Sequence, residues 1–552
     1  MNDITLAWPD TGPFLMQLFV ARQQVALELD RCFMGAAPPS GCRVVLYNET
    51  DAGLGDVAFA TKFARLMSTH LPTVELLIVS TDEAKQRNFQ LPEGVRVMSE
   101  VAFRALEDGA DKRPTLVVSA PGIFDHCRSR TMAYERLGLS EDVPFQYVAE
   151  YGSIRQLKDD AFKGMMGALE SLGDTFMDAV AEQHGLSPDD MGHSAKSGAV
   201  VGVFGEEVRP LDHLLTAYRQ PGDDNPMGAW LRQPLLGARS CGLERGELGI
   251  HVDARVPLMS PDASALGALE DEAIRGLLLE GCSPSEYAKN TSLYVGYAYE
   301  GLALFADYVA VLEVASDRPV DVVMPHRETA AKLAASLFDD ASLGRLSKRG
   351  VGRIEVVGKG ANGATERVEV GLGVGKTMRL ITHYPIPNHD FRALHRAAQP
   401  ATMVSGDQSF SEAVSMGKAV LYLEPVYCQT YHLDAVLELA GRVAPAAREV
   451  LNFGMQYRFD EERYPAVQAH LTSSEFYEEF RALNATIHAD HDCGPALMAL
   501  LSRVLWTIRS PAVHDATVQL LERAWSDAEV ARGVTLDGAG LSQLRAIAAE
   551  GP

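Results

Sequence analysis

Short apolar segments alternate with longer amphipathic ones along most of this chain. Near the N-terminus the pattern predicts strands over 44–47, 74–80 and 115–120, with a helix over 56–67 after the first of them. A second series of the same kind starts with the apolar segment 292–299. Strands that are separated by helices pair in parallel and are covered by helices on both faces, so the pattern predicts an α/β fold.

The two series divide the chain into successive lobes. A chain of 552 residues is too long for one hydrophobic core, so two or more domains are expected. We predict two Rossmann-like lobes with additional helices at both ends of the chain. Within the second lobe, residues 352–371 are predicted to form a β-hairpin. The expected divisions are a helical segment over 1–40, a first lobe with an insertion over 41–290, a second lobe over 291–455 and a helical region over 456–552.

The most informative stretch is ATMVSGDQSFSEAVSMGKAVLYLEP, residues 401–425. It predicts a strand, a Gly-Asp turn, a helix opening at Gln408 and Ser409, and a second strand. A strand that ends in a glycine turn and feeds a helix leaves backbone N–H groups at the positive end of the helix dipole, which is a seat for a phosphate. Glu412, one helical turn further on, could reach a ribose hydroxyl. The residues expected at this site are Gly406, Asp407, Gln408, Ser409 and Glu412.

The same stretch also has a purely structural interpretation. Ser409 and Glu412 match the S-x-x-E capping box, which stabilises a helix start by about 1 kcal/mol without any ligand. Capping and phosphate binding compete for the same amides, and we favour the ligand site because of the glycine turn and the strand on each side. Tyr422 and His432 follow as candidates to line the sugar or diphosphate, although core packing explains Tyr422 equally well.

Acidic residues follow the strands of the first lobe. Asp51 and Asp56 flank Gly55 in and after the loop that leaves the first strand, and Asp125 follows the strand at 115–120. A carboxylate at the mouth of a lobe can take a proton from an acceptor group, and Asp56 is the candidate base with Asp125 in reserve. The alternative is that Asp56 caps the helix that starts there.

These loops are expected to share one cleft. In open parallel sheets a ligand lies beyond the carboxyl ends of the strands. The loops 48–56, 120–126 and 405–409 should therefore face the same ligand.

Composition and net charge indicate which partners and which cellular compartment to expect. A net charge of −24 and no Lys/Arg-rich stretch disfavour nucleic acid as a partner. The odd number of cysteines, seven, with no CxxC pair indicates free thiols in a reducing compartment. The sequence shows no signal segment and no apolar run of membrane-spanning length. We therefore expect a protein without a membrane span that is cytoplasmic, or that is exported by a route that leaves no cleavable signal.

Two further motifs are set aside. GLGVGKT at 371–377 has Val370 where a phosphate-binding loop needs glycine, and it is expected to form a turn between strands. His488, Asp490, His491 and Asp492 could bind a metal, but they precede an apolar helix, and helix capping by Asp492 is the preferred interpretation.

Four segments of the chain share features with one known family: NETDAGLGDVAFATKFARLM (48–67), AEYGS (149–153), VGYAYE (295–300) and SGDQSFSEAVSMGKAVLYLEPVYCQTYHLDAV (405–436). In these places, in matching order, the chain resembles GT-B glycosyltransferases, and within them the protein-arginine rhamnosyltransferases that modify elongation factor P. The resemblance implies that an acidic residue of the first loop, Asp56 or Asp51, activates the acceptor and that Asp407 supports the donor. Gly55, Glu150 and Tyr151 are expected at the acceptor or cleft, and no bound metal or cofactor is expected. Ser405 stands where that family tends to have arginine.

The resulting hypothesis is an inverting, metal-independent glycosyltransferase. It would move a sugar from a nucleotide-diphosphate sugar, with dTDP-rhamnose or a UDP-sugar as candidates, to a protein or small-molecule acceptor. The first lobe would hold the acceptor and the second the donor. Two alternatives stay open: a nucleotide-sugar epimerase or hydrolase of the same fold, and a noncatalytic partner-binding protein.

Overall fold

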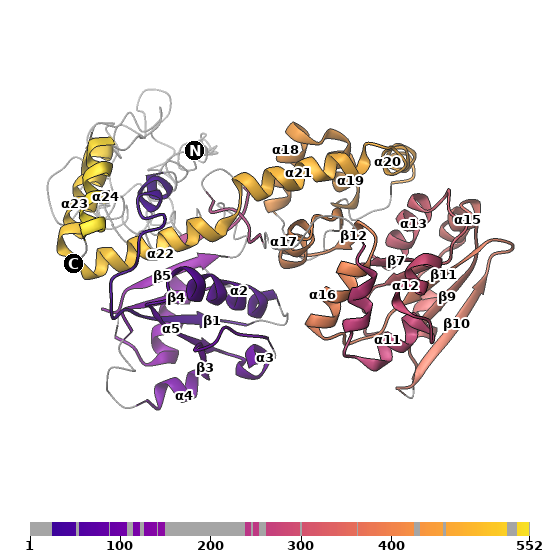
Figure 1. Ribbon diagram of the computed structural model, residues 1–552, viewed down its shortest axis with the longest axis horizontal. Helices are drawn as coiled ribbons and strands as arrows, with labels where there is room; N and C mark the ends of the chain where they lie inside the picture. The colour runs from indigo at the N-terminus through magenta and orange to yellow at the C-terminus, as the bar shows by residue number, and fades with distance from the viewer. Residues whose placement is uncertain are drawn as a thin grey trace, which may run out of the picture. The chain divides into compact units, whose positions relative to one another are not determined.

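The computed structural model describes residues 25–50, 55–87, 89–106, 114–121, 126–140, 142–149, 238–243, 247–252, 261–298, 301–361, 363–423, 431–455, 460–526 and 538–550. These residues form two compact units. The first comprises Met1–Gly249 together with Cys493–Pro552, and the second comprises Ile250–Asp492. Each unit is built on its own sheet (Figure 1).

The first unit contains a six-stranded parallel sheet in the order β3-β2-β1-β4-β5-β6. Its central strands are buried over nearly their whole length, because helices cover both faces of the sheet. The strands are β1 (Arg43–Asn48), β2 (Glu75–Ser80), β3 (Arg96–Ser99), β4 (Leu116–Ser119), β5 (Phe145–Ala149) and β6 (Ala238–Ser240). The helices are α2 (Gly55–His70), α3 (Glu83–Arg87), α4 (Glu100–Arg104), α5 (His126–Leu137), α22 (Cys493–Arg509), α23 (Pro511–Ser526) and α24 (Gly538–Glu550).

Alternate residues of β1 enter two different cores. Val44 and Leu46 pack with Phe63 of α2 and Leu501 of α22. On the opposite face, Val45 and Tyr47 pack with Phe103 of α4 and Ala133 of α5. Helix α22, from the C-terminal part of the chain, therefore completes a core that begins near the N-terminus.

A buried ion cluster joins α22 to two distant segments. Asp30 Oδ1 lies 2.6 Å from Arg503 Nε, and Asp30 Oδ2 lies 2.7 Å from Arg239 Nη2. All three side chains are almost fully buried. Since breaking a buried ion pair leaves an uncompensated charge, this cluster should be sensitive to the loss of Asp30.

Among the described residues, no single helix is long and apolar enough to cross a membrane. The segments Cys493–Arg509 and Pro511–Leu521 pass that test only as a pair, and they are bent by 113°.

The second unit contains a five-stranded sheet, β10-β9-β11-β8-β7, and a two-stranded sheet, β12-β13. The two are joined at the edge of β7, because Tyr297 forms a parallel bridge with Val404 and Thr402 Oγ1 donates to Val295 O at 2.6 Å. The strands are β7 (Ser292–Val295), β8 (Val320–Val323), β9 (Val351–Lys359), β10 (Thr365–Gly371), β11 (Lys376–Ile381), β12 (Ala401–Val404) and β13 (Ala419–Tyr422).

Helices surround this sheet and continue beyond it. Near the sheet lie η3 (Ala263–Ala268), α11 (Glu272–Leu279), α12 (Pro284–Asn290), α13 (Leu302–Leu312), α14 (Ala330–Ser336), α15 (Asp340–Lys348), α16 (Asn388–Ala397) and α17 (Asp407–Ser415). The chain then forms α18 (Tyr431–Val443), α19 (Pro445–Met455), α20 (Tyr464–Leu471) and α21 (Phe476–Asp490).

The sequence predictions of fold class are confirmed. The chain is an α/β protein with two Rossmann-like lobes, and the hairpin predicted within 352–371 is the antiparallel pair β9-β10. Gly371 ends β10 and Lys376 begins β11, so the glycine-rich stretch is the predicted turn between strands.

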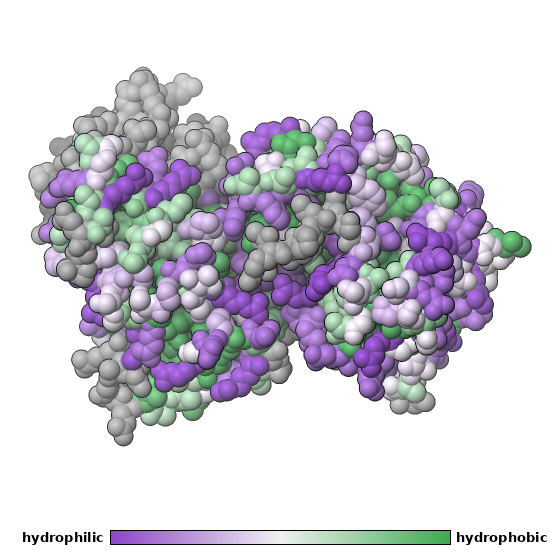
Figure 2. Space-filling view, viewed as in Figure 1, coloured by the Kyte–Doolittle hydropathy of each residue, from purple (hydrophilic) through white to green (hydrophobic). Residues whose placement is uncertain are grey.

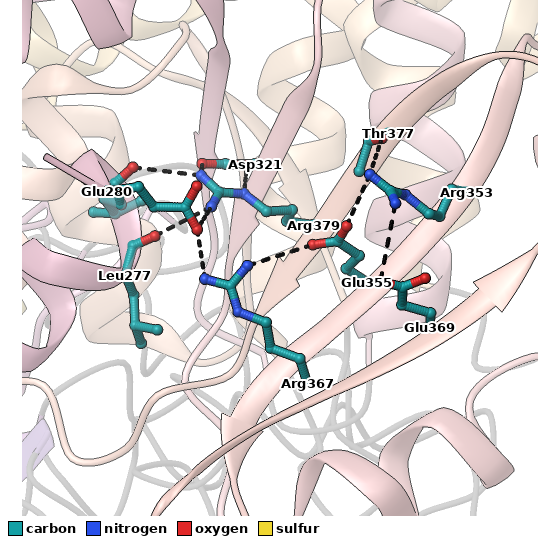
Figure 3. Close-up of polar contacts among 10 residues, drawn as sticks. Leu277, Glu280, Asp321, Arg353, Glu355, Arg367, Glu369, Thr377 and Arg379 are labelled. Atoms are coloured by element: carbon teal, nitrogen blue, oxygen red, sulfur yellow. Dashed lines mark hydrogen bonds and ion pairs between the residues drawn. The ribbon is translucent and has the colours of Figure 1, made fainter. Parts of the chain in front are cut away.

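One polar network crosses four strands of the second sheet (Figure 3). Arg379 of β11 pairs with buried Asp321 of β8 at 2.6 Å and with Glu280 at 2.8 Å. Arg379 Nη1 also donates to the Leu277 carbonyl at 3.2 Å, near the end of α11. Arg367 of β10 extends the network to Glu280. The network therefore ties the end of α11 to the sheet.

On the face shown in Figure 2, hydrophilic residues are spread over the described parts of both units, with apolar residues between them. Scattered surface apolar residues of this kind are normal and need no partner to explain them.

Candidate functional site

The order of strands reverses once in each sheet. In the first unit β1 is followed by β2 on one side, and the chain later returns to β4 on the other side. In the second unit β7 is followed by β8 on one side and is bridged to β12 on the other. Ligands of open α/β sheets bind outside the carboxyl ends of strands at such switch points. The loops predicted from the sequence, 48–56, 120–126 and 405–409, leave strands at these two positions.

The helix at the second switch point starts one residue earlier than predicted. Helix α17 begins at Asp407, and Gly406 precedes it with φ 85°. A non-glycine residue adopts this backbone conformation only at a cost, which explains the glycine. Gly406 has no side chain that could accept a hydrogen bond from the first-turn amides.

The capping-box interpretation of this helix is wrong. Ser409 lies inside the first turn of α17, and its hydroxyl donates to the carbonyls of Ser405 at 2.6 Å and Gly406 at 2.9 Å. A capping serine would instead precede the helix and accept from an amide. The serine hydroxyl is therefore directed to the preceding carbonyls and does not cap the first-turn amides of α17.

Tyr422 supports this turn from within the core. Its side chain is fully buried, its ring lies edge-on to Phe410 with centroids 6.0 Å apart, and its hydroxyl accepts from the Gly406 amide at 3.2 Å. These contacts agree with the interpretation of Tyr422 as a packed core residue.

The remaining predicted donor residues lie on two helices. Glu412 is half-buried in the second turn of α17, and Gln408 is in the first turn. Asp407 is the first residue of α17 and His432 the second of α18; the structure describes only their backbones.

The loop after β7 lies against the same turn. The Tyr297 amide donates to Met403 O at 2.7 Å, and the Ser405 amide donates to Tyr297 O at 2.8 Å. A Cβ at Gly296 would lie 3.1 Å from Met403 O of β12 and 2.8 Å from the Phe305 side chain, so glycine favours this close approach. The Tyr297 side chain is 51% exposed, which leaves an aromatic ring accessible at the switch point.

Two more exposed groups follow neighbouring strands of this sheet. Arg327 follows β8, and its guanidinium lies 5.4 Å from the ring centroid of Tyr384, which follows β11 and is 40% exposed. Tyr297, Arg327 and Tyr384 were not among the residues predicted for the site, because single exposed residues carry no local pattern. They follow β7, β8 and β11, which are neighbours in the sheet, and ligands of open α/β sheets bind beyond the carboxyl ends of such strands.

At the first switch point, the first turn of α2, which contains Asp56, lies beside the buried side-chain amide of Asn48. Gly55 and Asp56 are the first two residues of α2, so Asp56 lies in the first turn, not before it. Asn48, at the end of β1, is fully buried and donates to the Asp56 carbonyl at 3.1 Å. Asn48 was not predicted from the sequence. The other predicted residues of this unit, Asp51, Asp125, Glu150 and Tyr151, lie outside the described residues.

Within the described residues, no group of three or more His, Cys, Asp or Glu side chains is arranged to hold a metal ion. In the predicted His/Asp cluster, His488 Nε2 lies 2.9 Å from the Val414 carbonyl. Asp492 immediately precedes α22, and burial lowers the pKa of His491.

Comparison with known proteins gives structural likenesses only. No protein-family model matches the chain, and no curated protein matches its sequence. A glycosyl transferase family 9 protein from Veillonella parvula is 9% identical, with 70% of this chain and 82% of that chain covered and a TM-score of 0.29. UGT71G1 of Medicago truncatula, solved with UDP-glucose, is 10% identical, with 84% and 97% covered and a TM-score of 0.38.

Alr3699/HepE of Anabaena, solved with UDP and glucose, is 9% identical, with 82% of this chain and 96% of that chain covered and a TM-score of 0.32. Likenesses at these identities and scores identify neither a family nor an activity for this chain.

Proposed function

We propose that this protein is an inverting, metal-independent glycosyltransferase of the GT-B type. It transfers a sugar from a nucleotide-diphosphate sugar, with dTDP-rhamnose and UDP-sugars as the first candidates, to a protein or small-molecule acceptor. The acidic net charge favours a basic or neutral acceptor, such as an arginine side chain. We place the reaction in the cytoplasm, without a resident cofactor.

The start of α17 carries this proposal. A glycine with positive φ turns the chain from β12 into a helix whose first-turn amides face no capping side chain from Gly406. Amides at the positive end of a helix dipole bind phosphate oxygens and stabilise the charge that develops on a leaving diphosphate. Glu412 lies one turn further along the same helix, where a ribose hydroxyl could bind it.

The acceptor chemistry belongs to the first unit in this proposal. A carboxylate at the start of α2 takes the proton from the acceptor as the sugar is transferred. Asp56 is the proposed general base, with Asp51 and Asp125 as the other candidate acids. Glu150 and Tyr151 are proposed to line the acceptor side.

A thermal-shift experiment tests the donor site. The purified protein is heated with dTDP, UDP, GDP and ADP and with the corresponding nucleotide sugars. A ligand at 100 times its Kd stabilises the folded state by about 2.7 kcal/mol, so the correct nucleotide series should raise the Tm. Asp407→Ala and Glu412→Ala should abolish the shift.

The matched control is Asp340→Ala, which removes an exposed first-turn acid from α15 of the same unit. This variant should keep the full shift. If no nucleotide shifts the Tm of the unmodified protein, the glycosyltransferase proposal fails and the noncatalytic alternative takes its place. If sugar is released or epimerised without any acceptor, the hydrolase or epimerase alternative is correct.

A further inference from the structure

The carboxyl end of β1 is fixed by three consecutive residues, each to a different neighbour. The Thr50 amide and hydroxyl contact Thr81 Oγ1, just after β2, at 2.9 and 2.8 Å. The Glu49 carboxylate is buried and accepts from Ser129 of α5 at 3.3 Å. Asn48 contacts α2, which follows β1, and the segment that follows β4. This strand end is therefore held from several sides.

Asn48 uses one amide group to join the two loops. Its Nδ2 donates to the Asp56 carbonyl in the first turn of α2 at 3.1 Å and to the Ala120 carbonyl after β4 at 3.4 Å. Its Oδ1 accepts from Ser80 Oγ of β2 at 3.4 Å. The side chain is fully buried, so these contacts replace hydration that the amide has lost.

The chemistry of these contacts selects asparagine. Two carbonyl oxygens must be satisfied by one short side chain that also presents an acceptor, and only an amide provides two N–H donors and an oxygen at this length. An aspartate of the same shape would direct one carboxylate oxygen at both carbonyls, and an alanine would remove the bridge. The backbone of Asp56 is held by the first of these N–H donors.

We propose that Asn48 is a positioning residue for Asp56, fixing the first turn of α2 against the loop after β4 so that the carboxylate meets the acceptor. This inference rests on the proposed function, in which Asp56 is the general base. A displacement of a reacting group by about 1 Å can cost about 100-fold in rate. The expected effect therefore falls on kcat and leaves the donor site of the second unit intact.

The experiment compares Asn48→Ala and Asn48→Asp with Thr81→Val. The control removes a neighbouring contact of the same strand end without touching Asp56. Steady-state sugar transfer gives kcat and the KM for the donor, and hydrogen exchange reports the first turns of α2. Both Asn48 variants should lose about 100-fold in kcat at an unchanged donor KM, with faster exchange in α2. Thr81→Val should stay within a few-fold of the unmodified protein in both measurements.

Any one of three results would overturn the proposal. The first is nearly full kcat in Asn48→Ala, and the second is a loss of kcat in Thr81→Val as large as in the Asn48 variants. The third is an unchanged rate of hydrogen exchange in α2 of the Asn48 variants. If the unmodified protein transfers no sugar, the proposed function fails by itself. The exchange measurement then still decides whether Asn48 holds the first turn of α2.

Discussion

The two switch points are built from different parts of the chain. In the first unit, side chains make most of the contacts: buried Asn48 and half-buried Thr50 join β1 to α2, to the residue after β2 and to the segment after β4. In the second unit the backbone makes most of them, through the amides of Tyr297, Ser405 and Gly406. In the first unit Gly55 and Asp56 are the first two residues of α2, whereas in the second unit Gly406 precedes α17 and Asp407 begins it.

The contacts at the two switch points, here called the two edges, should be sensitive to different kinds of substitution. A side-chain contact is lost by a substitution that preserves shape, because one hydrogen-bonding group disappears. A backbone contact survives most substitutions and is lost when the backbone conformation itself becomes unfavourable. Both edges should therefore respond to side-chain changes, and the second should respond in addition to a change of backbone conformation at its glycine.

The largest effect is expected for Asp56→Asn in the first unit. The variant keeps the shape of the side chain and removes the proposed base, so kcat for sugar transfer should fall by about 100- to 10,000-fold. Nucleotide binding, measured by calorimetry, should stay unchanged. Glu83→Gln is the matched control, since Glu83 is a first-turn acid of α3 in the same unit. Full activity in Asp56→Asn would move the base to Asp51 or Asp125.

A smaller effect is expected for Gly406→Val in the second unit. A β-branched residue at φ 85° should cost about 1–2 kcal/mol of unfolding free energy and displace the start of α17. Nucleotide affinity should fall at least 10-fold by calorimetry, which corresponds to about 1.4 kcal/mol.

The control for this variant is Gly350→Val, at the residue that immediately precedes β9 in the same unit. Gly350 has φ 78°, and a Cβ there meets nothing within 4 Å, as at Gly406. The stability loss should therefore match that of Gly406→Val while nucleotide binding is retained. Equal loss of binding in both variants would mean that strain alone, and not the position of the turn, explains the result.

The smallest effect concerns pH and the second unit. Burial lowers the pKa of Lys418, at the start of β13, from 10.5 to about 7. Its ammonium donates to the carbonyls of Ala398 at 2.9 Å and Gln399 at 3.0 Å. Between pH 7 and 10.5 the unfolded state binds more protons at this group, so its contribution to stability should rise with pH in that window.

Lys418→Met should remove that slope, which is at most about 1.4 kcal/mol per pH unit for one proton. Urea unfolding at pH 7, 8 and 9 measures it. Other groups face Lys418 or its surroundings, notably His395, whose pKa burial lowers to about 3, and Glu412. An unchanged slope in Lys418→Met would assign the pH dependence to those groups.

Much of the fold was predictable because local pattern determines it. β1 and β12 read as apolar runs between turn residues, and they are buried strands at those places. The turn at Gly406 was predicted correctly because its glycine serves a backbone need. The helix was predicted to open at Gln408 and Ser409, whereas the positive φ at Gly406 lets it begin at Asp407.

The contacts that sequence could not predict are those between distant segments. Asp30 and Arg503 are 473 positions apart, and nothing around either residue indicates the other. Asn48 was visible in the first loop, but its role depends on Ala120, which is 72 positions away. A pattern of apolar and polar residues determines which face of an element is buried, but not which distant polar group meets it.

The packing of α22 against β1 has a consequence for synthesis on the ribosome. Leu497 and Leu501 belong to the same core as Val44 and Leu46, so one face of the first sheet stays exposed until these late residues emerge. The second unit is continuous in the chain and can fold before α22 emerges, because residues 250–492 take roughly 12–49 s to synthesise at about 5–20 residues per second. Chaperones that shield apolar surfaces of nascent chains should therefore bind the first unit for longer than the second.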